Sequence, residues 1–176
     1  RHTELPVYFT EFHGSEQKRS VQLNEAFKFV QKDMIKNNRN PAKTFVGVYD
    51  ADSYPDTKTL KYIDLKARED NTNVAFQQTM NYLLNSKNIS EMKNFLLLSN
   101  AYYQTMWNYC FEQEQYFRTN RKIDLKKTPY LPPYCMGHGE FFRTDLLSRI
   151  NGFPDFGPAD GIQIGYILSG KGIKIL

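Results

Sequence analysis

The fold of this chain is decided by one short stretch, Phe45-Val46-Gly47-Val48-Tyr49-Asp50-Ala51-Asp52-Ser53-Tyr54-Pro55-Asp56. An apolar run of strand length ends in two acidic residues one position apart, and a turn containing Ser, Pro and Asp follows. Because alternate side chains of a strand point to the same face, we expect Asp50 and Asp52 to project together at the carboxyl end of the strand. Two close carboxylates repel unless a cation lies between them, which favours a site for a hard divalent ion. The alternative interpretation is a solvated turn rich in aspartate.

Helical and extended patterns alternate on both sides of this stretch. Upstream, apolar residues recur on one helical face between about residues 16 and 37. Downstream, Asp56 is a candidate N-cap for a helix that runs through Ala67, and residues 74–78 predict the next strand. A strand, a helix and a strand in this spacing indicate a βαβ unit. We therefore expect an α/β fold with a mixed, mainly parallel sheet flanked by helices.

The remaining patterns predict a similar alternation of helices, strands and loops. Residues 134–143 form a glycine-punctuated segment that leads into an apolar run. Further elements are expected as follows: a short strand at 7–12, one long or two shorter helices at 91–121, a short helix at 144–150, a helix from Asp160 to about Gly170, and the start of a strand at 173–176.

The composition is that of a soluble globular protein. The chain has 176 residues, of which 40% are apolar and 24% charged, enough for one domain or most of one. The net charge of +4 suits an anionic substrate or a negatively charged membrane surface, and no basic run is dense enough to predict a nucleic-acid partner. Cys110 and Cys135 form no Cys-x-x-Cys pair, which favours a reducing, cytoplasmic compartment without a disulfide framework. No apolar run approaches membrane-spanning length.

Four segments carry motif-like patterns: Lys18-Arg19-Ser20-Val21-Gln22-Leu23-Asn24, Val48-Tyr49-Asp50-Ala51-Asp52-Ser53, Val74-Ala75-Phe76-Gln77-Gln78-Thr79, and Gly137-His138-Gly139-Glu140-Phe141-Phe142-Arg143 followed by Asn151-Gly152-Phe153 and Asp160. In this order they resemble the Lys-x-x-x-x-Leu-Asn, Asp-x-Asp, Val-Gln-Thr, Gly-x-x-x-x-x-Arg, Gly-Gly-Phe and Glu-Asp motifs of family-2 glycosyltransferases. That family has the GT-A fold and includes the cellulose-synthase-like enzymes. The resemblance extends over nearly the whole chain.

The resemblance implies that residues 1–176 form part of a GT-A-like, Rossmann-like catalytic domain. The family's first strand and nucleotide-base pocket are then expected before Arg1, and its Gln-x-x-Arg-Trp segment after Leu176. The implied activity is that of an inverting glycosyltransferase, which moves a sugar from a nucleotide-sugar donor such as a UDP-sugar to a hydroxyl of a glycan or lipid-linked acceptor. Parts outside residues 1–176 are expected to bring the protein to the cytoplasmic face of a membrane.

The resemblance also assigns roles to individual residues. Asp50 and Asp52 are expected to hold Mg²⁺ or Mn²⁺, which acts as a Lewis acid on the departing diphosphate. Lys18 is expected near that diphosphate, where its cation adds to the stabilisation; otherwise it is an exposed helix lysine. Asp160 is expected to be the base that activates the acceptor hydroxyl; otherwise it is a helix N-cap.

The glycine loop is expected on the acceptor side of the site, with Gly137, His138 and Gly139 as its candidate residues. An imidazole between two glycines is accessible, and it can contact an acceptor or a metal. The alternative for His138 is a loop histidine without a chemical role.

Two other functional classes remain open. Ala159 stands where the family has Glu, which favours a non-catalytic or degenerate GT-A module that binds a sugar or a partner. A metal-dependent nucleotidyltransferase also places metal-binding carboxylates on an α/β sheet. That class predicts a glycine-rich phosphate loop near its first strand.

Overall fold

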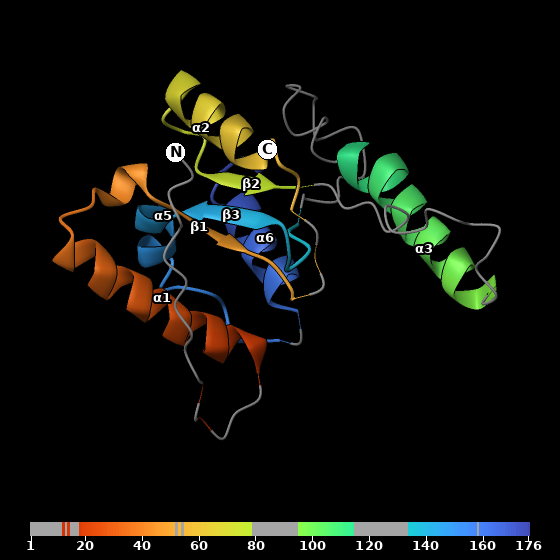
Figure 1. The fold of residues 1–176 in the computed structure, drawn as a ribbon, viewed down its shortest axis with the longest axis horizontal. Helices are drawn as coiled ribbons and strands as arrows, with labels where there is room; N and C mark the ends of the chain where they lie inside the picture. The colour runs from red at the N-terminus through yellow and green to blue at the C-terminus, as the bar shows by residue number, and fades with distance from the viewer. Residues whose placement is uncertain are drawn as a thin grey trace, which may run out of the picture.

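A computed structural model describes residues 12, 14, 18–51, 53, 55–78, 95–114, 134–157 and 159–176 of the chain. Within these residues the fold is mixed α/β, with a small sheet between helices (Figure 1). The strand expected at 7–12 lies outside the described residues apart from Phe12, and so does Asp52 of the Asp-x-Asp pair.

The sheet contains β1 (Phe45–Val48), β2 (Ala75–Gln77) and β3 (Glu140–Arg143) in the order β1-β3-β2. Both pairings are antiparallel. The prediction of a mainly parallel sheet is therefore wrong for the described strands. β1 and β2 run in the same direction, as expected of a βαβ unit, but β3 lies between them and pairs with both.

The central position of β3 follows from its sequence. Phe141 and Phe142 are 5% and 0% exposed, and they point to opposite faces of the sheet. A strand that is apolar on both faces is stable only when both faces and both edges are covered. Glu140, the first residue of β3, lies opposite Val48 on one side and Gln77 on the other.

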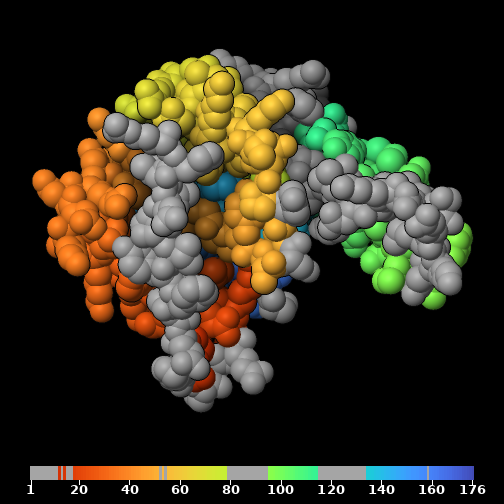
Figure 2. All heavy atoms as spheres, viewed as in Figure 1, coloured from red at the N-terminus to blue at the C-terminus, as the bar shows by residue number. Residues whose placement is uncertain are grey.

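The helices are close to their predicted positions. They are α1 (Arg19–Lys36), α2 (Thr59–Glu69), α3 (Phe95–Trp107), α5 (Thr144–Arg149) and α6 (Asp160–Gly170), with a 3₁₀ turn at Pro41–Lys43 and a π-helix at Asn108–Glu112. Helix α3 lies to one side of the sheet (Figures 1 and 2). Among the described helices, none combines the length and apolar character needed to cross a membrane.

Two apolar clusters cover the two faces of the sheet. The larger cluster joins Phe142 to α5 and α6 through Leu146, Leu147, Ile164 and Leu168. The smaller cluster joins Phe141 and Phe76 to Ile63 of α2. The segment 173–176, predicted to begin a strand, is not assigned as one, although Leu176 exchanges backbone hydrogen bonds of 3.1 and 2.7 Å with Ala75 and Gln77.

Helix α6 packs directly against the extended segment 134–137 because two of its three glycines face that segment. Gly161 and Gly165 lie one turn apart on the helix, and a Cβ on either would collide with backbone atoms of that segment. Cys135 N–H donates a 3.1 Å hydrogen bond to the Gly161 carbonyl. The close approach places the glycine loop beside the first turn of α6.

We expect Gly165→Ala to destabilise the protein by about 1–3 kcal/mol, the usual cost of overpacking a rigid contact. The added methyl group meets backbone at Tyr134 and Cys135, which cannot rotate away. Gly170→Ala is the matched control, because a methyl group at the C-terminal end of the same helix meets nothing within 4 Å. Chemical denaturation measures both, and equal stability of the two variants would contradict the packing described for α6.

Candidate functional site

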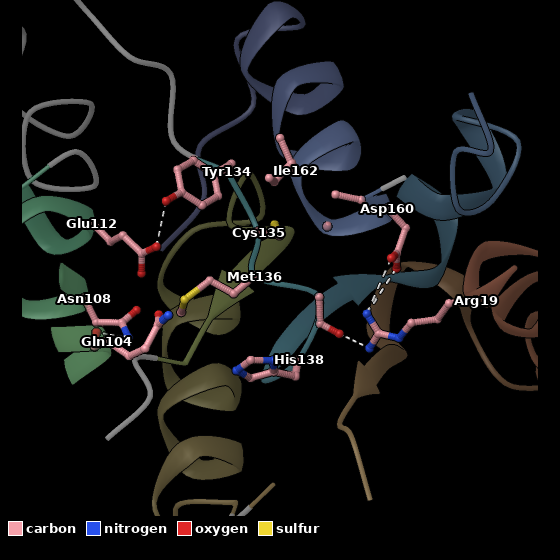
Figure 3. A pocket seen from close by; sticks show the side chains of 13 residues that line it. Arg19, Gln104, Asn108, Glu112, Tyr134, Cys135, Met136, His138, Asp160 and Ile162 are labelled. Carbon is pink, nitrogen blue, oxygen red and sulfur yellow. Dashed lines mark hydrogen bonds and ion pairs between the residues drawn. The ribbon is translucent and has the colours of Figure 1, made fainter. Parts of the chain in front are cut away.

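Arg19 joins three segments that are far apart in sequence. It is the first residue of α1, and its Nη2 donates a 2.9 Å hydrogen bond to Asp50 Oδ1. Its Nη1 lies 3.3 Å from Asp160 Oδ2, and Nη2 also donates to the Gly137 carbonyl. The guanidinium therefore connects the end of β1, the glycine loop and the start of α6. Figure 3 shows its contact with Asp160. No role was predicted for Arg19 from the sequence, although it follows Lys18 directly.

The backbone of the glycine loop explains why Arg19 can reach this position. Gly137 has a φ of +81°, which favours glycine, and a Cβ at this residue would meet the Arg19 guanidinium. Gly139 has a φ of +65°, and its N–H donates a 2.7 Å hydrogen bond to the Val48 carbonyl. The loop is thus held against the end of β1, next to Asp50.

Gln77 fixes the same loop from the other side of β3. Its Nε2 donates to the His138 carbonyl at 2.9 Å, and its Oε1 accepts a 2.9 Å hydrogen bond from Met136 N–H. Gln77 belongs to the segment that resembles the Val-Gln-Thr motif. Its contacts give that segment a structural role, which is to position the glycine loop.

Two other motif segments also meet in space. The Asn24 side chain accepts from Phe153 N–H and donates to the Phe153 carbonyl, both at 2.8 Å. Gly152 has a φ of +84°, and a Cβ there would collide with the Asn24 amide. These contacts hold α1 against the turn after α5, so that Arg19 faces the site.

Asp160 is a buried carboxylate in the first turn of α6. It is 9% exposed, and its side chain forms an ion pair with Arg19. The N-cap of α6 is Ala159, and no side chain caps the helix there. Asp160 is therefore not the N-cap of α6, which was the alternative role expected for it. A carboxylate at a helix N-terminus is also favoured by the helix dipole.

Asp50 and His138 lie side by side at the mouth of the site. His138 Nδ1 is 3.4 Å from Asp50 Oδ2, and the imidazole is 16% exposed. Within the described residues, no group of three His, Cys, Asp or Glu side chains could hold a metal ion. Of the two expected metal ligands, the structure describes Asp50 alone, and its two carboxylate oxygens face Arg19 and His138. Carboxylate oxygens are ligands that Mg²⁺ and Mn²⁺ prefer.

Lys18 lies at the rim of the site. Among the described residues it forms no ion pair with Asp50 or Asp160. Its side chain is 60% exposed and forms a 3.3 Å ion pair with Asp155. Together with Asp155 and Asp160 it lines an open cavity of about 380 Å³, the second of two cavities beside Asp160. The expected exposed lysine and the expected diphosphate contact are both compatible with this position.

Glu140 is a fully buried carboxyl beneath the site that was not singled out from the sequence. It is 0% exposed, and neither carboxyl oxygen has a hydrogen-bond partner among the described residues. Burial above all, and then the Asp160 charge, raise the pKa of Glu140 to about 8, while the Arg19 charge opposes them. The only sequence signal was a charged residue at the start of an otherwise apolar strand.

We expect Glu140→Gln to remove a pH dependence of stability. The pKa of Glu140 rises from an ordinary 4.5 to about 8 in the folded protein, so between these values the folded chain keeps a proton that the unfolded chain releases. The unfolding free energy of the wild type therefore falls as pH rises, by at most about 1.4 kcal/mol per pH unit from this group. The Gln variant lacks this loss and gains stability relative to wild type between about pH 5 and 8.

Denaturant titrations at three pH values spread across that window measure this difference. Glu25→Gln, an exposed glutamate on α1, is the control and should follow the wild-type profile. If the unfolding free energy of Glu140→Gln also changes with pH as that of the wild type does, Glu140 is charged in the folded protein and its assigned environment is wrong.

A cavity of about 260 Å³ opens beside Asp160 and Arg19. The segment 134–138 and the start of α6 form one wall, and Gln104, Asn108 and Glu112 form the other (Figure 3). The site thus combines two carboxylates, a guanidinium, an imidazole and a polar cavity. Such an arrangement is chemically suited to a charged or hydroxylated ligand and contains a carboxylate able to accept a proton.

A scan against protein-family models finds no match, and neither a search of curated proteins nor one of solved structures finds a similar chain. A function for this chain therefore has to be inferred from its residues and their geometry.

Proposed function

We propose that this chain is part of an inverting glycosyltransferase that uses a nucleotide-sugar donor. One observation carries the proposal: Asp50 at the end of a strand and Asp160 at the start of a helix face the same guanidinium beside a polar cavity. The proposed metal-dependent transfer uses one carboxylate to hold a cation at the leaving diphosphate and a second carboxylate to take the proton of the acceptor. The resemblance to family-2 glycosyltransferases assigns these two roles to the same two residues.

The donor side is formed by Asp50, with Asp52 as its expected partner and Lys18 at the rim. A divalent Mg²⁺ or Mn²⁺ ion bound there supplies Lewis-acid stabilisation of the UDP leaving group. Asp50 orients its Oδ1 toward Arg19 and its Oδ2 toward His138, so that its carboxylate is held in place. Lys18 contributes an exposed positive charge close to the second cavity.

The acceptor side is formed by Asp160 and the glycine loop. The Asp160 carboxylate accepts the proton of the acceptor hydroxyl as that hydroxyl attacks the anomeric carbon. Arg19 fixes the orientation of Asp160 through the ion pair, and His138 lines the approach to it. A glycan or lipid-linked acceptor enters through the cavity of about 260 Å³.

A non-catalytic module that binds sugar is the second candidate. Arg19 forms ion pairs with both carboxylates, which neutralises the charges that a metal and a proton would use. Ala159, in place of the expected Glu, lines the cavity without a polar side chain. This candidate predicts ligand binding without release of UDP.

The test is UDP release from a panel of UDP-sugars in the presence of Mg²⁺ or Mn²⁺. Because the resemblance places the nucleotide-base pocket before Arg1, the full-length protein is used. We expect release that a chelator abolishes and that Asp50→Ala and Asp52→Ala remove, while Asp56→Ala in the same turn retains it. Absence of release with every UDP-sugar favours the binding module, and pyrophosphate release from a nucleoside triphosphate favours a nucleotidyltransferase.

A further inference from the structure

The π-helix at Asn108–Glu112 lies directly beside the cavity next to Asp160. Its hydrogen bond runs from Gln113 N–H to the Asn108 carbonyl, five residues back, and continues from the last turn of α3. π-helical turns are rare and recur at functional sites, because the wider turn redirects side chains. Here Asn108 and Glu112 both line the cavity, as does Gln104 one turn earlier (Figure 3).

Two of the side chains in this cavity wall carry a buried oxygen atom without a hydrogen-bond partner among the described residues. Asn108 is 2% exposed and Glu112 is 6% exposed, yet Asn108 Oδ1 and Glu112 Oε2 have no hydrogen-bond partner among the described residues. A buried polar atom without a partner is costly, so such atoms usually bind a water or a ligand. Both atoms accept hydrogen bonds when Glu112 is ionised, so a ligand with hydrogen-bond donors would satisfy them.

The orientation of Glu112 is fixed by its other oxygen. Tyr134 O–H donates a 2.7 Å hydrogen bond to Glu112 Oε1, and Trp107 Nε1–H lies 3.3 Å from the Tyr134 hydroxyl. Asn108 is fixed in the same way, because its Nδ2 donates to the Gln104 carbonyl at 2.9 Å. One polar atom of each side chain therefore holds it in place, and the other has no partner among the described residues.

We propose that Asn108 and Glu112 form a sugar subsite that accepts hydrogen bonds from two hydroxyl groups of the acceptor. The inference rests on the proposed function, since it names the substrate class of the same site. A cavity of about 260 Å³ has room for one monosaccharide unit, and Asp160 lies in its opposite wall. A sugar held through two hydroxyls on the π-helix presents a third hydroxyl toward the Asp160 carboxylate. Tyr134, which also lines the cavity, adds aromatic surface of the kind on which sugar rings pack.

The test uses the fluorescence of Trp107, the single tryptophan of the chain. The probes are methyl glycosides of glucose, galactose, mannose and N-acetylglucosamine, added without donor, and cyclohexanol is the control ring without a hydroxyl array. Glu112→Gln keeps the acceptor for Tyr134 but replaces the free oxygen with an N–H donor. Glu114→Gln, an exposed carboxylate two residues later, is the matched control.

We expect at least one glycoside to change the fluorescence in a saturable manner, while cyclohexanol does not. Glu112→Gln should weaken that binding by about ten- to a hundredfold, the loss expected for a hydrogen bond to a charged group, and Glu114→Gln should leave it unchanged. If Glu112→Gln binds every probe as the wild type does, or no glycoside binds, ordered water satisfies these oxygens and the subsite is wrong.

The outcome for the subsite is separable from the outcome for the proposed function. In the full-length enzyme, Glu112→Gln should raise the KM for the acceptor with little change in kcat. UDP release that is equal in both proteins at every acceptor concentration overturns the subsite alone. Glycoside binding without any UDP release supports the subsite and overturns the transferase.

Discussion

Asp160→Asn should reduce sugar transfer by about 10²- to 10⁴-fold, the usual loss when a general base is removed. The substitution keeps the shape of the side chain and removes its ability to take a proton. Donor binding should persist, because Asp50 and Asp52 are unchanged and the proposal assigns Asp160 to the acceptor side. Single-turnover transfer measures the chemical step, and UDP binding by calorimetry measures the donor side separately.

Asp155→Asn is the matched control for this prediction. Asp155 is a second carboxylate near the site, and it pairs with Lys18 and accepts a hydrogen bond from Ser20. It should retain transfer within a few-fold of the wild type. Transfer by Asp160→Asn at the wild-type rate would remove Asp160 from the chemistry and leave the carboxylate as a structural partner of Arg19.

Arg19→Met should lose both stability and activity. Methionine keeps much of the packing of the side chain but leaves Asp50 and Asp160 without their shared cation, above the buried Glu140. Because the guanidinium is 35% exposed, we expect a loss of about 1–3 kcal/mol, below the ~3–5 kcal/mol of a fully buried pair. Transfer should fall at least about tenfold, since the carboxylate of Asp160 loses the group that orients it.

Lys18→Met is the control for Arg19, because it removes an adjacent positive charge that is 60% exposed. Its unfolding free energy should stay within about 0.5 kcal/mol of the wild type, as for most surface positions. Thermal and chemical denaturation measure both variants. Equal stability of Arg19→Met and Lys18→Met would show that the contacts of Arg19 do not hold the three segments together.

The local elements could be predicted because their patterns are short-range. The apolar run before Asp50 indicated β1, and apolar periodicity indicated α1 and α2 to within a few residues. The strand pairing could not be predicted in this way. It depends on β3, which comes far after β2 in the sequence and lies between β1 and β2 in the sheet. Such long-range pairings leave no trace in local periodicity.

Some residues of the candidate site could be singled out from the sequence, because they lie in local motif-like patterns. Asp50, His138 and Asp160 were singled out, and the structure brings each of them to the Arg19 guanidinium or to its immediate neighbour. Arg19 was missed because a charged residue at a helix start usually lies in solvent. Lys18 was chosen in its place on the resemblance, and it lies at the rim. Which of two adjacent basic residues faces inward depends on the rotation of α1, which the Asn24 contact with Phe153 fixes.

Buried polar residues were the least predictable part. Glu140, Asn108 and Glu112 resemble ordinary surface residues in the sequence, and each is buried in the structure. Their burial depends on how α3, β3 and α6 pack together. The π-helix could not be recognised either, because the extra residue in its turn replaces an α-helical hydrogen bond without a distinct sequence pattern.

The most direct test of the proposed mechanism is the anomeric configuration of the first product formed by the full-length enzyme. A single attack by a hydroxyl activated at Asp160 inverts the configuration, because base and leaving group lie on opposite faces of the sugar. We predict that a UDP-α-sugar gives a β-linked product, observed by proton NMR before any equilibration. An α-linked product would contradict the assignment of Asp160 as the base of a direct displacement.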